Sequence, residues 1–186
     1  MRWAGLLAVG ALLLAGCASS KNLENVPDCG SLGQAQLTLM AQAVPTAELL
    51  PCVKAMPNGW EFGGLKVRSG QARFWLDSDR DGHHAVAVLL RRGCDTAGST
   101  GSVSEIPGVS RYERVTRVTD GYGGERHYRF AGGCITYRFD LHGTTRAEPL
   151  AAVSEALDFV TRNSVAKRVE DESDGRLQLD PAPTEG

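Results

Sequence analysis

Between residues 60 and 141 the sequence alternates apolar and polar residues in a series of short runs. The clearest run is ITYRFDL, residues 135–141, in which every second residue is apolar. Successive side chains of a strand point to opposite faces, so this period predicts half-buried β-strands. The run HAVAVLL, residues 84–90, is apolar on both faces, as in a central strand. Together these runs predict about six strands joined by short turns, which is typical of an antiparallel sheet.

Helical periods flank the region of alternation. Residues 31–43 carry apolar residues at helical spacing, and Thr46 could cap a short second helix that reaches Met56. A helical period returns from Ala147, and a second stretch continues through Val169. The order of helices, strands and helices predicts an α+β fold, with the N-terminal and C-terminal helices packed on one face of the sheet.

The chain begins with three features of an export signal: Arg2, an apolar run over residues 4–16, and the sequence LAGC at residues 14–17. The apolar run is shorter than the ~20 residues that a spanning helix needs, but it suits the apolar part of a secretory signal. LAGC resembles the lipobox of bacterial lipoproteins. This resemblance implies that residues 1–16 are a signal peptide and that Cys17 carries the lipid, including palmitate.

The length and pattern of the rest of the chain predict its domain organisation, and the resemblance implies a location. Residues 17–28 would be the lipidated cysteine and its tether, residues 29–180 a single α+β domain, and residues 181–186 a tail. More than one acyl chain holds a protein stably on a membrane. We therefore expect a protein anchored by lipid to the cell membrane, on its extracytoplasmic face.

Four cysteines follow Cys17, and none of their spacings is the CxxC of a thiol redox or zinc site. An even number of cysteines in an oxidising compartment predicts two disulfides, for which three pairings exist. Cys29 and Cys52 bracket the N-terminal helices. Cys94 ends the most apolar strand and Cys134 begins the clearest one, so we expect the bridges Cys29–Cys52 and Cys94–Cys134.

The segment WLDSDRDGHH, residues 75–84, begins as a calcium loop does, with Asp77, Asp79 and Asp81 before a glycine. An EF-hand would need a bidentate acid at the twelfth position, where this chain has Val88, and helices on both sides. Asp and Gly are also the residues of hairpin turns. We expect a solvated hairpin here, with a non-helical calcium turn as the alternative.

One pattern on the predicted sheet concerns binding. If the apolar face packs under the helices, the other face carries basic residues around an aromatic one. Such a stripe could meet anionic lipid headgroups, another anionic envelope component or an acidic envelope protein, or it could be an ordinary solvated face. Its members are Lys66, Arg68, Arg73, Trp75, His127, Arg129 and Arg138.

Composition and motifs exclude several functions. The formal net charge is −2, which does not suggest a nucleic-acid binder. The chain has no GxSxG motif, no phosphate-binding glycine loop and no obvious set of zinc ligands, so we expect no cofactor. The sequence favours a non-enzymatic module of the cell envelope that binds a ligand or partner. The alternative is a cell-envelope hydrolase whose catalytic residues are scattered along the chain.

A longer resemblance rests on the segments PCVKAMPNGW, RFWLDSDRDG, GGCITYRFDL and SDGRLQLDP. In these the chain resembles a family of actinobacterial proteins that are secreted or anchored to the membrane, over about residues 51–181. That family has no known function, so the resemblance implies a location and a fold but no catalytic residues.

Overall fold

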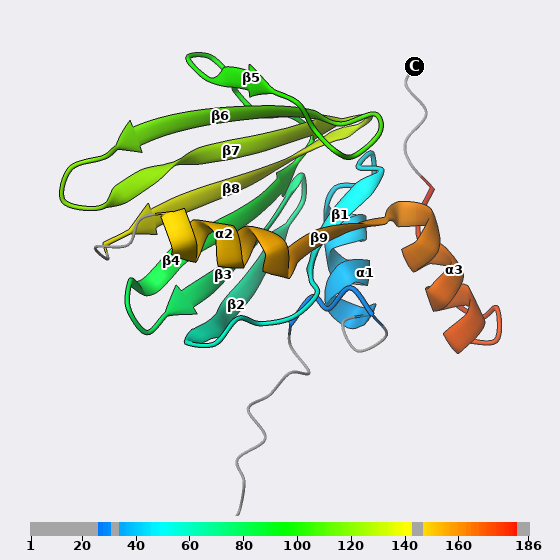
Figure 1. Ribbon diagram of the computed structural model, residues 1–186. Helices are drawn as coiled ribbons and strands as arrows, with labels where there is room; N and C mark the ends of the chain where they lie inside the picture. Colours follow the sequence, from blue (N-terminus) through cyan, green and yellow to red (C-terminus); the bar gives the residue numbers. More distant parts are fainter. Residues whose placement is uncertain (1–25, 31–33, 143–146, 182–186) are drawn as a thin grey trace, which may run out of the picture.

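The computed structural model, which describes residues 26–30, 34–142 and 147–181, is built on a seven-stranded antiparallel sheet (Figure 1). The strand order is β2-β3-β4-β8-β7-β6-β5, and the α+β class with an antiparallel sheet is confirmed. The strands are β2 (Trp60–Arg68), β3 (Gln71–Ser78), β4 (Gly82–Arg91), β5 (Thr100–Ser102), β6 (Ser110–Arg117), β7 (Tyr122–Phe130) and β8 (Gly133–Leu141).

One face of this sheet is covered by a second layer, which is visible in front of the strands in Figure 1. The layer contains helices α1 (Gln34–Ala43) and α2 (Ala147–Ala156), and a two-stranded ribbon of β1 (Leu49–Val53) with β9 (Leu157–Thr161). Leu37, Leu50 and Val153 from this layer join one buried cluster with the inward side chains of the large sheet. The covered face is called the core face below, and the opposite one the outer face.

The segment predicted as a short helix between Thr46 and Met56 is instead strand β1, so that prediction was wrong. Pro51 disfavours a helix interior but suits a ribbon of two strands, in which each strand has a free edge. β1 pairs with β9 from Leu49 opposite Thr161 to Val53 opposite Leu157. Nothing in the local sequence signals β9, because its pairing partner lies far away along the chain.

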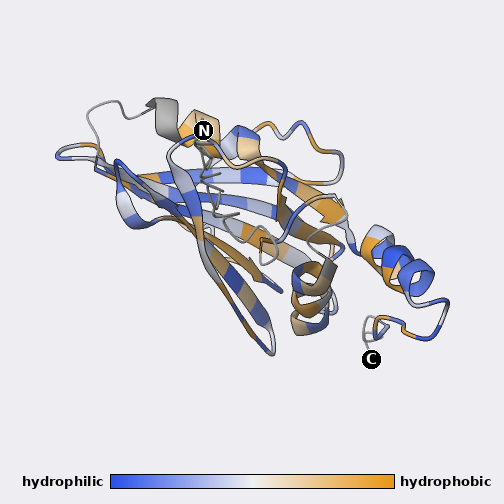
Figure 2. Ribbon diagram, turned by 90° about the horizontal axis from the view of Figure 1, so that it is seen from below, coloured by the Kyte–Doolittle hydropathy of each residue, from blue (hydrophilic) through white to orange (hydrophobic). Residues whose placement is uncertain are grey.

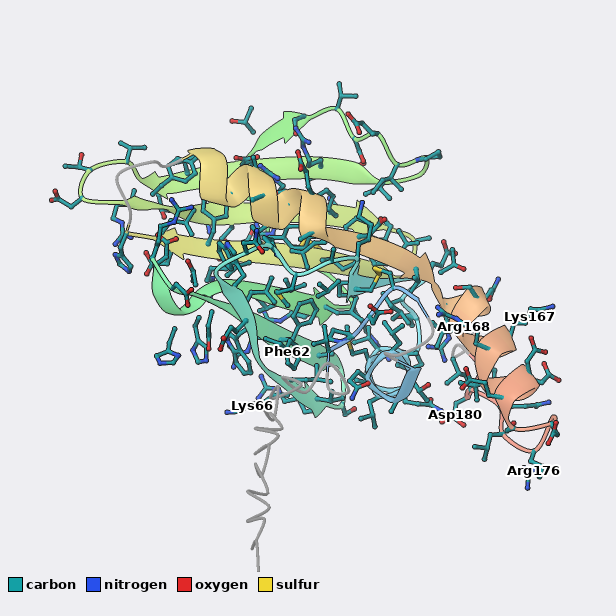
Figure 3. All side chains as sticks on the ribbon, turned by 60° about the horizontal axis from the view of Figure 1, so that its bottom comes forward. Phe62, Lys66, Lys167, Arg168, Arg176 and Asp180 are labelled. Carbon is teal, nitrogen blue, oxygen red and sulfur yellow. A yellow bond between two sulfur atoms is a disulfide. The ribbon has the colours of Figure 1, made fainter. Side chains whose placement is uncertain are left out.

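Helix α3 (Arg162–Glu172) ends the fold and packs mainly against α1. Its surface is largely hydrophilic (Figure 2), and Val165 is its fully buried side chain. Two arginines tie it to the main chain of other elements: Arg162 donates to the Ala41 carbonyl at 2.6 Å, and Arg168 to the carbonyl of Cys29 at 3.5 Å. Figure 3 shows Arg168 on α3 beside the more outward Lys167.

Both expected disulfides are present. Cys29–Cys52 joins the segment before α1 to β1, with the Cα atoms 5.0 Å apart. Cys94–Cys134 joins the loop after β4 to the start of β8, with a Cα separation of 5.8 Å. In the loop-entropy model each bridge stabilises the fold by about 3–4 kcal/mol. Within the described residues, the helices are too short or too polar to cross a membrane. The expected signal peptide, Cys17 and residues 182–186 of the expected tail lie outside that range.

Gly132 provides a stability test, because it lies at a left-handed φ of 70° in the turn between β7 and β8. A Cβ atom there would lie 1.8 Å from the Thr46 carbonyl oxygen, so the main chain would have to move. Gly70, at φ 78°, has open space around its Cβ position and is a matched control. We expect Gly70→Ala to lower the free energy of unfolding by ~1–2 kcal/mol, and Gly132→Ala by at least ~2 kcal/mol more. Equal losses in urea titrations would contradict the close approach of Thr46.

Candidate functional site

The β3–β4 hairpin contains the three aspartates of the possible calcium loop. The Asp77 carboxylate accepts the His84 backbone N–H at 2.7 Å and lies 3.1 Å from the Nδ1 atom of His83. Burial alone would raise the pKa of Asp77, but these contacts with His84 and His83 bring it below its ordinary value. Asp77 therefore accepts a hydrogen bond from the main chain near the start of β4.

Asp81 is buried, and its carboxylate has different partners from that of Asp77. One of its carboxylate oxygens accepts the Ser78 hydroxyl at 3.1 Å, and the other accepts the His142 backbone N–H at 2.9 Å. Asp79 is exposed and its own N–H donates to Gly59 at 2.8 Å. In the described residues, the three aspartates do not form a group with all ligand atoms within 4.8 Å of one another. The segment is the hairpin expected from the sequence, but it is solvated only in part, because Asp81 is buried.

The outer face contains every member of the predicted basic stripe. Side chains of directly paired residues in neighbouring strands share a face. The registers pair Lys66 with Arg73, Arg73 with Leu89 and onward through Thr136 to His127. Corresponding rows hold the remaining members, Arg68, Trp75, Arg129 and Arg138, on that same face.

Arg138 forms an ion pair within the fold, so its charge is offset by a carboxylate. Its Nε and Nη2 atoms donate to one oxygen of Glu125 at 2.8 and 2.7 Å, and Arg114 donates to the other oxygen at 2.7 Å. Burial would raise the pKa of Glu125, which is 14% exposed, but the two arginines bring it below its ordinary value. Glu125 is thus a carboxylate shared by two guanidinium groups.

Trp75 lies beneath two cationic side chains and is too buried to contact a ligand itself. Its side chain is only 8% exposed and stacks on His84 with ring centroids 4.8 Å apart. The guanidinium carbon of Arg73 lies 4.6 Å from the Trp75 ring centre, and the Lys66 ammonium lies 5.6 Å from it. Cation–π attraction of this kind orients the two side chains on the surface. Lys66 extends away from β2 in Figure 3.

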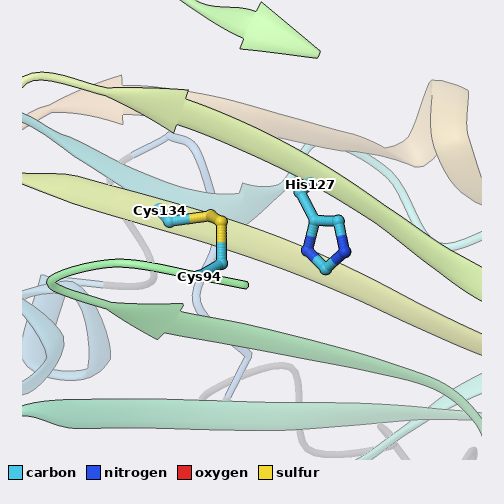
Figure 4. A group of neighbouring side chains, drawn as sticks. All are labelled: Cys94, His127 and Cys134. Carbon is cyan, nitrogen blue, oxygen red and sulfur yellow. A yellow bond between two sulfur atoms is a disulfide. The ribbon is translucent and has the colours of Figure 1, made fainter. Parts of the chain in front are cut away.

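His127 is buried, with 3% of its surface exposed. Its Nδ1 atom lies 2.9 Å from the Thr136 hydroxyl, and its Nε2 atom is 3.7 Å from Glu125 without a hydrogen-bond partner. It lies beside the Cys94–Cys134 bridge (Figure 4), with ligand atoms of all three residues within 4.8 Å of one another. Metals bind cysteine as the thiolate, and here both sulfurs are used in the disulfide.

Five cations remain on the outer face and form what we call the basic patch. In the described part of the chain none of them has a carboxylate within 4.0 Å. Arg91 was missed in the sequence because it ends an apolar run, although its alternation with Ala87 and Leu89 predicts the outer face. It lies in one cross-strand row with Arg68 and Arg129. The basic patch consists of Lys66, Arg68, Arg73, Arg91 and Arg129.

The contact of His127 with Glu125 is the kind of feature that a hydrolase would need, so access to it matters. The Thr136 hydroxyl, which lies 2.9 Å from the Nδ1 atom of His127, belongs to a side chain that is 8% exposed. An adjacent cavity of about 330 Å³ is lined by Glu125 and Arg138 but not by His127 or Thr136. A substrate in that cavity would therefore not reach the Thr136 hydroxyl.

Comparison of the chain with models of protein families, with curated proteins and with solved structures finds no match. The resemblances to bacterial lipoproteins and to an actinobacterial family therefore remain expectations from the sequence.

The buried state of His127 predicts a pH dependence of stability. Burial lowers the pKa of His127 below its ordinary value, so near pH 6 the unfolded chain binds a proton that the folded protein does not. The contribution of His127 to the free energy of unfolding is complete above pH ~6.5, the ordinary pKa of histidine in an unfolded chain. It is lost as the pH falls below that value. One proton gives a slope of at most ~1.4 kcal/mol per pH unit.

Replacement of His127 by glutamine should remove this slope, because glutamine does not titrate. The measurement is the free energy of unfolding in urea at several pH values between about 7.5 and 5.5. A slope in that interval that persists unchanged in His127→Gln would show that other groups cause it and would contradict a neutral, buried His127.

Proposed function

We propose that the protein is a lipid-anchored binding module on the extracytoplasmic face of the cell membrane. In this proposal its basic patch contacts the anionic headgroups of the membrane that holds the anchor. The anchor is Cys17, at the end of the lipobox-like sequence. No catalytic residue and no cofactor are assigned, and nucleic acid is not a partner.

The observation that carries this proposal is the basic patch itself. Five cations project from strands β2, β3, β4 and β7 on the face that the helical layer leaves open, and they have no carboxylate within 4.0 Å in the described residues. Arg138, in contrast, is paired with Glu125 on the same face. Cations that the fold leaves unpaired together on one face suit a surface of negative charge.

The magnitude of this attraction explains why an anchor would be needed. A basic residue near an anionic membrane contributes ~1 kcal/mol, so five contribute ~5 kcal/mol. Alone, that corresponds to a dissociation constant on the order of 0.2 mM. A short tether holds the domain near the surface at an effective concentration of about a millimolar. The patch of an anchored molecule would then be in contact with the headgroups for most of the time.

The test is sedimentation with vesicles, using the chain from residue 18 onward so that no lipid is attached. Vesicles with anionic lipid should bind it weakly at low salt and release it at high salt, because charge attraction is screened within ~8 Å at physiological ionic strength. Replacing Arg68, Arg91 and Arg129 by serine should abolish binding. These three side chains lie in one row of the patch. Their replacement leaves Arg73 and Lys66 on the Trp75 ring.

A matched control removes three exposed cations elsewhere, Arg80, Lys167 and Arg176, and so changes the net charge equally. The control should bind like the unaltered chain. If both triple variants bind equally, net charge and not the patch is responsible. If the unaltered chain does not bind vesicles at low salt, the membrane is not the partner, and an anionic envelope polymer or another envelope protein becomes the next candidate.

The lipid anchor requires its own test in cells. Cys17→Ala should abolish incorporation of labelled palmitate and release the protein from the membrane fraction, since the cysteine thiol is the expected site of lipid attachment. A variant that stays bound to the membrane, together with an unaltered chain that takes up no label, would refute the lipoprotein proposal.

A further inference from the structure

A second feature lies on the core face, where α2 meets the hairpin of β6 and β7. A cavity of about 450 Å³ opens there, within the range of ~300–1,000 Å³ that is usual for small-molecule sites. Val118 and Tyr122 from the hairpin and Leu150 and Ala151 from the helix form apolar walls. Val118 is 57% exposed, so α2 covers this end of the sheet only in part.

Polar groups at one side of the cavity are fixed in position. Arg126 on β7 donates from Nε to Glu113 at 2.9 Å and from Nη1 to the Ser154 hydroxyl on α2 at 3.0 Å. Arg126 and Glu113 are 15% and 25% exposed, so the pair is partly shielded from water. Arg126 also has a side-chain hydrogen bond with Tyr128. A guanidinium has five N–H donors, so these three bonds leave donors for a further acceptor.

The charges of Arg126 and Glu113 restrict which ligands can bind, because together the two side chains are neutral. A ligand carboxylate would be attracted by Arg126 but repelled by Glu113. A ligand cation would be attracted by Glu113 but repelled by Arg126. An uncharged group with a hydroxyl can donate to the carboxylate and accept from the guanidinium. Beside apolar walls of this size, that combination matches a molecule with one hydrocarbon chain and a neutral, hydroxylated head.

We propose that this groove between α2 and the β6–β7 hairpin binds the acyl chain of a neutral, single-chain amphiphile, with its head on the Arg126–Glu113 pair. The groove is on the face opposite the basic patch and uses none of its residues. The proposal therefore stands or fails independently of membrane docking.

The first test measures equilibrium binding of radiolabelled monolauroylglycerol, below its micelle concentration, to the full chain. Ala151→Trp places an indole in the groove from an exposed position on α2, and Ala97→Trp adds the same indole at an exposed position in the loop after β4. The apolar segment of residues 4–16 is the same in all three proteins, so differences between them report on the groove.

Ala151→Trp should weaken binding about tenfold or more, as expected when a ligand's apolar contacts are lost, and Ala97→Trp should bind like the unaltered chain. Equal binding by all three proteins, or no binding by the unaltered chain beyond that of Ala151→Trp, would overturn the proposal. Circular dichroism of each variant checks that the fold is retained.

The second test addresses the head group. Laurate should bind the unaltered chain more weakly than monolauroylglycerol by about tenfold, because its carboxylate would lie beside the like charge of Glu113. Glu113→Gln keeps an oxygen for Arg126 but removes the negative charge, so it should improve laurate binding and close this gap. A preference for laurate in the unaltered chain, or a gap that Glu113→Gln does not change, would refute the neutral head group.

Discussion

The pairing of β4 with β8 is the interaction on which the rest of the structure depends. It joins two sets of consecutive hairpins, β2–β3–β4 and β5–β6–β7–β8, into one sheet. The pairing runs from Val86 opposite Phe139 to Arg91 opposite Cys134, and β4 is buried on both faces from Ala85 to Leu90. Because neither face is exposed to water, burial of apolar area stabilises the pairing on both sides.

The Cys94–Cys134 bridge begins where this pairing ends. The bridge ties the connection between β4 and β5 to the start of β8, and so holds this connection against the sheet. His127 is buried beside it. A central ladder, the bridge at its end and the neutral imidazole beside the bridge thus form one dry region of an otherwise polar face. The five cations of the basic patch lie on the same face as these buried groups.

The sequence predicts those elements whose pattern is local. Alternation in residues 135–141 predicts β8, the two-sided apolar run predicts the central β4, and the positions of Cys94 and Cys134 at strand ends predict their bridge. β1 and β9 are not predicted, because each has five residues and is a strand only through pairing with the other.

The membership of the site is predictable only in part, for a related reason. Alternation predicts which residues face outward, but the state of each depends on neighbours from other strands. Arg138 is neutralised because register sets Glu125 beside it, and Trp75 is covered because Arg73 and Lys66 lie over its ring. The groove at Arg126 requires Ser154 from a distant helix, and no spacing in the sequence indicates that contact.

The two edges of the sheet have a consequence for molecules that are crowded together. At one edge, β2 contains an irregularity between Phe62 and Gly64, and Gly64 has a φ of 129° that interrupts a regular ladder. At the other edge, β5 has only three residues. Exposed strand edges are templates for joining one chain to the next, and irregular, charged or very short edge strands prevent this. Neighbouring copies can therefore reach high density without joining their sheets into fibrils.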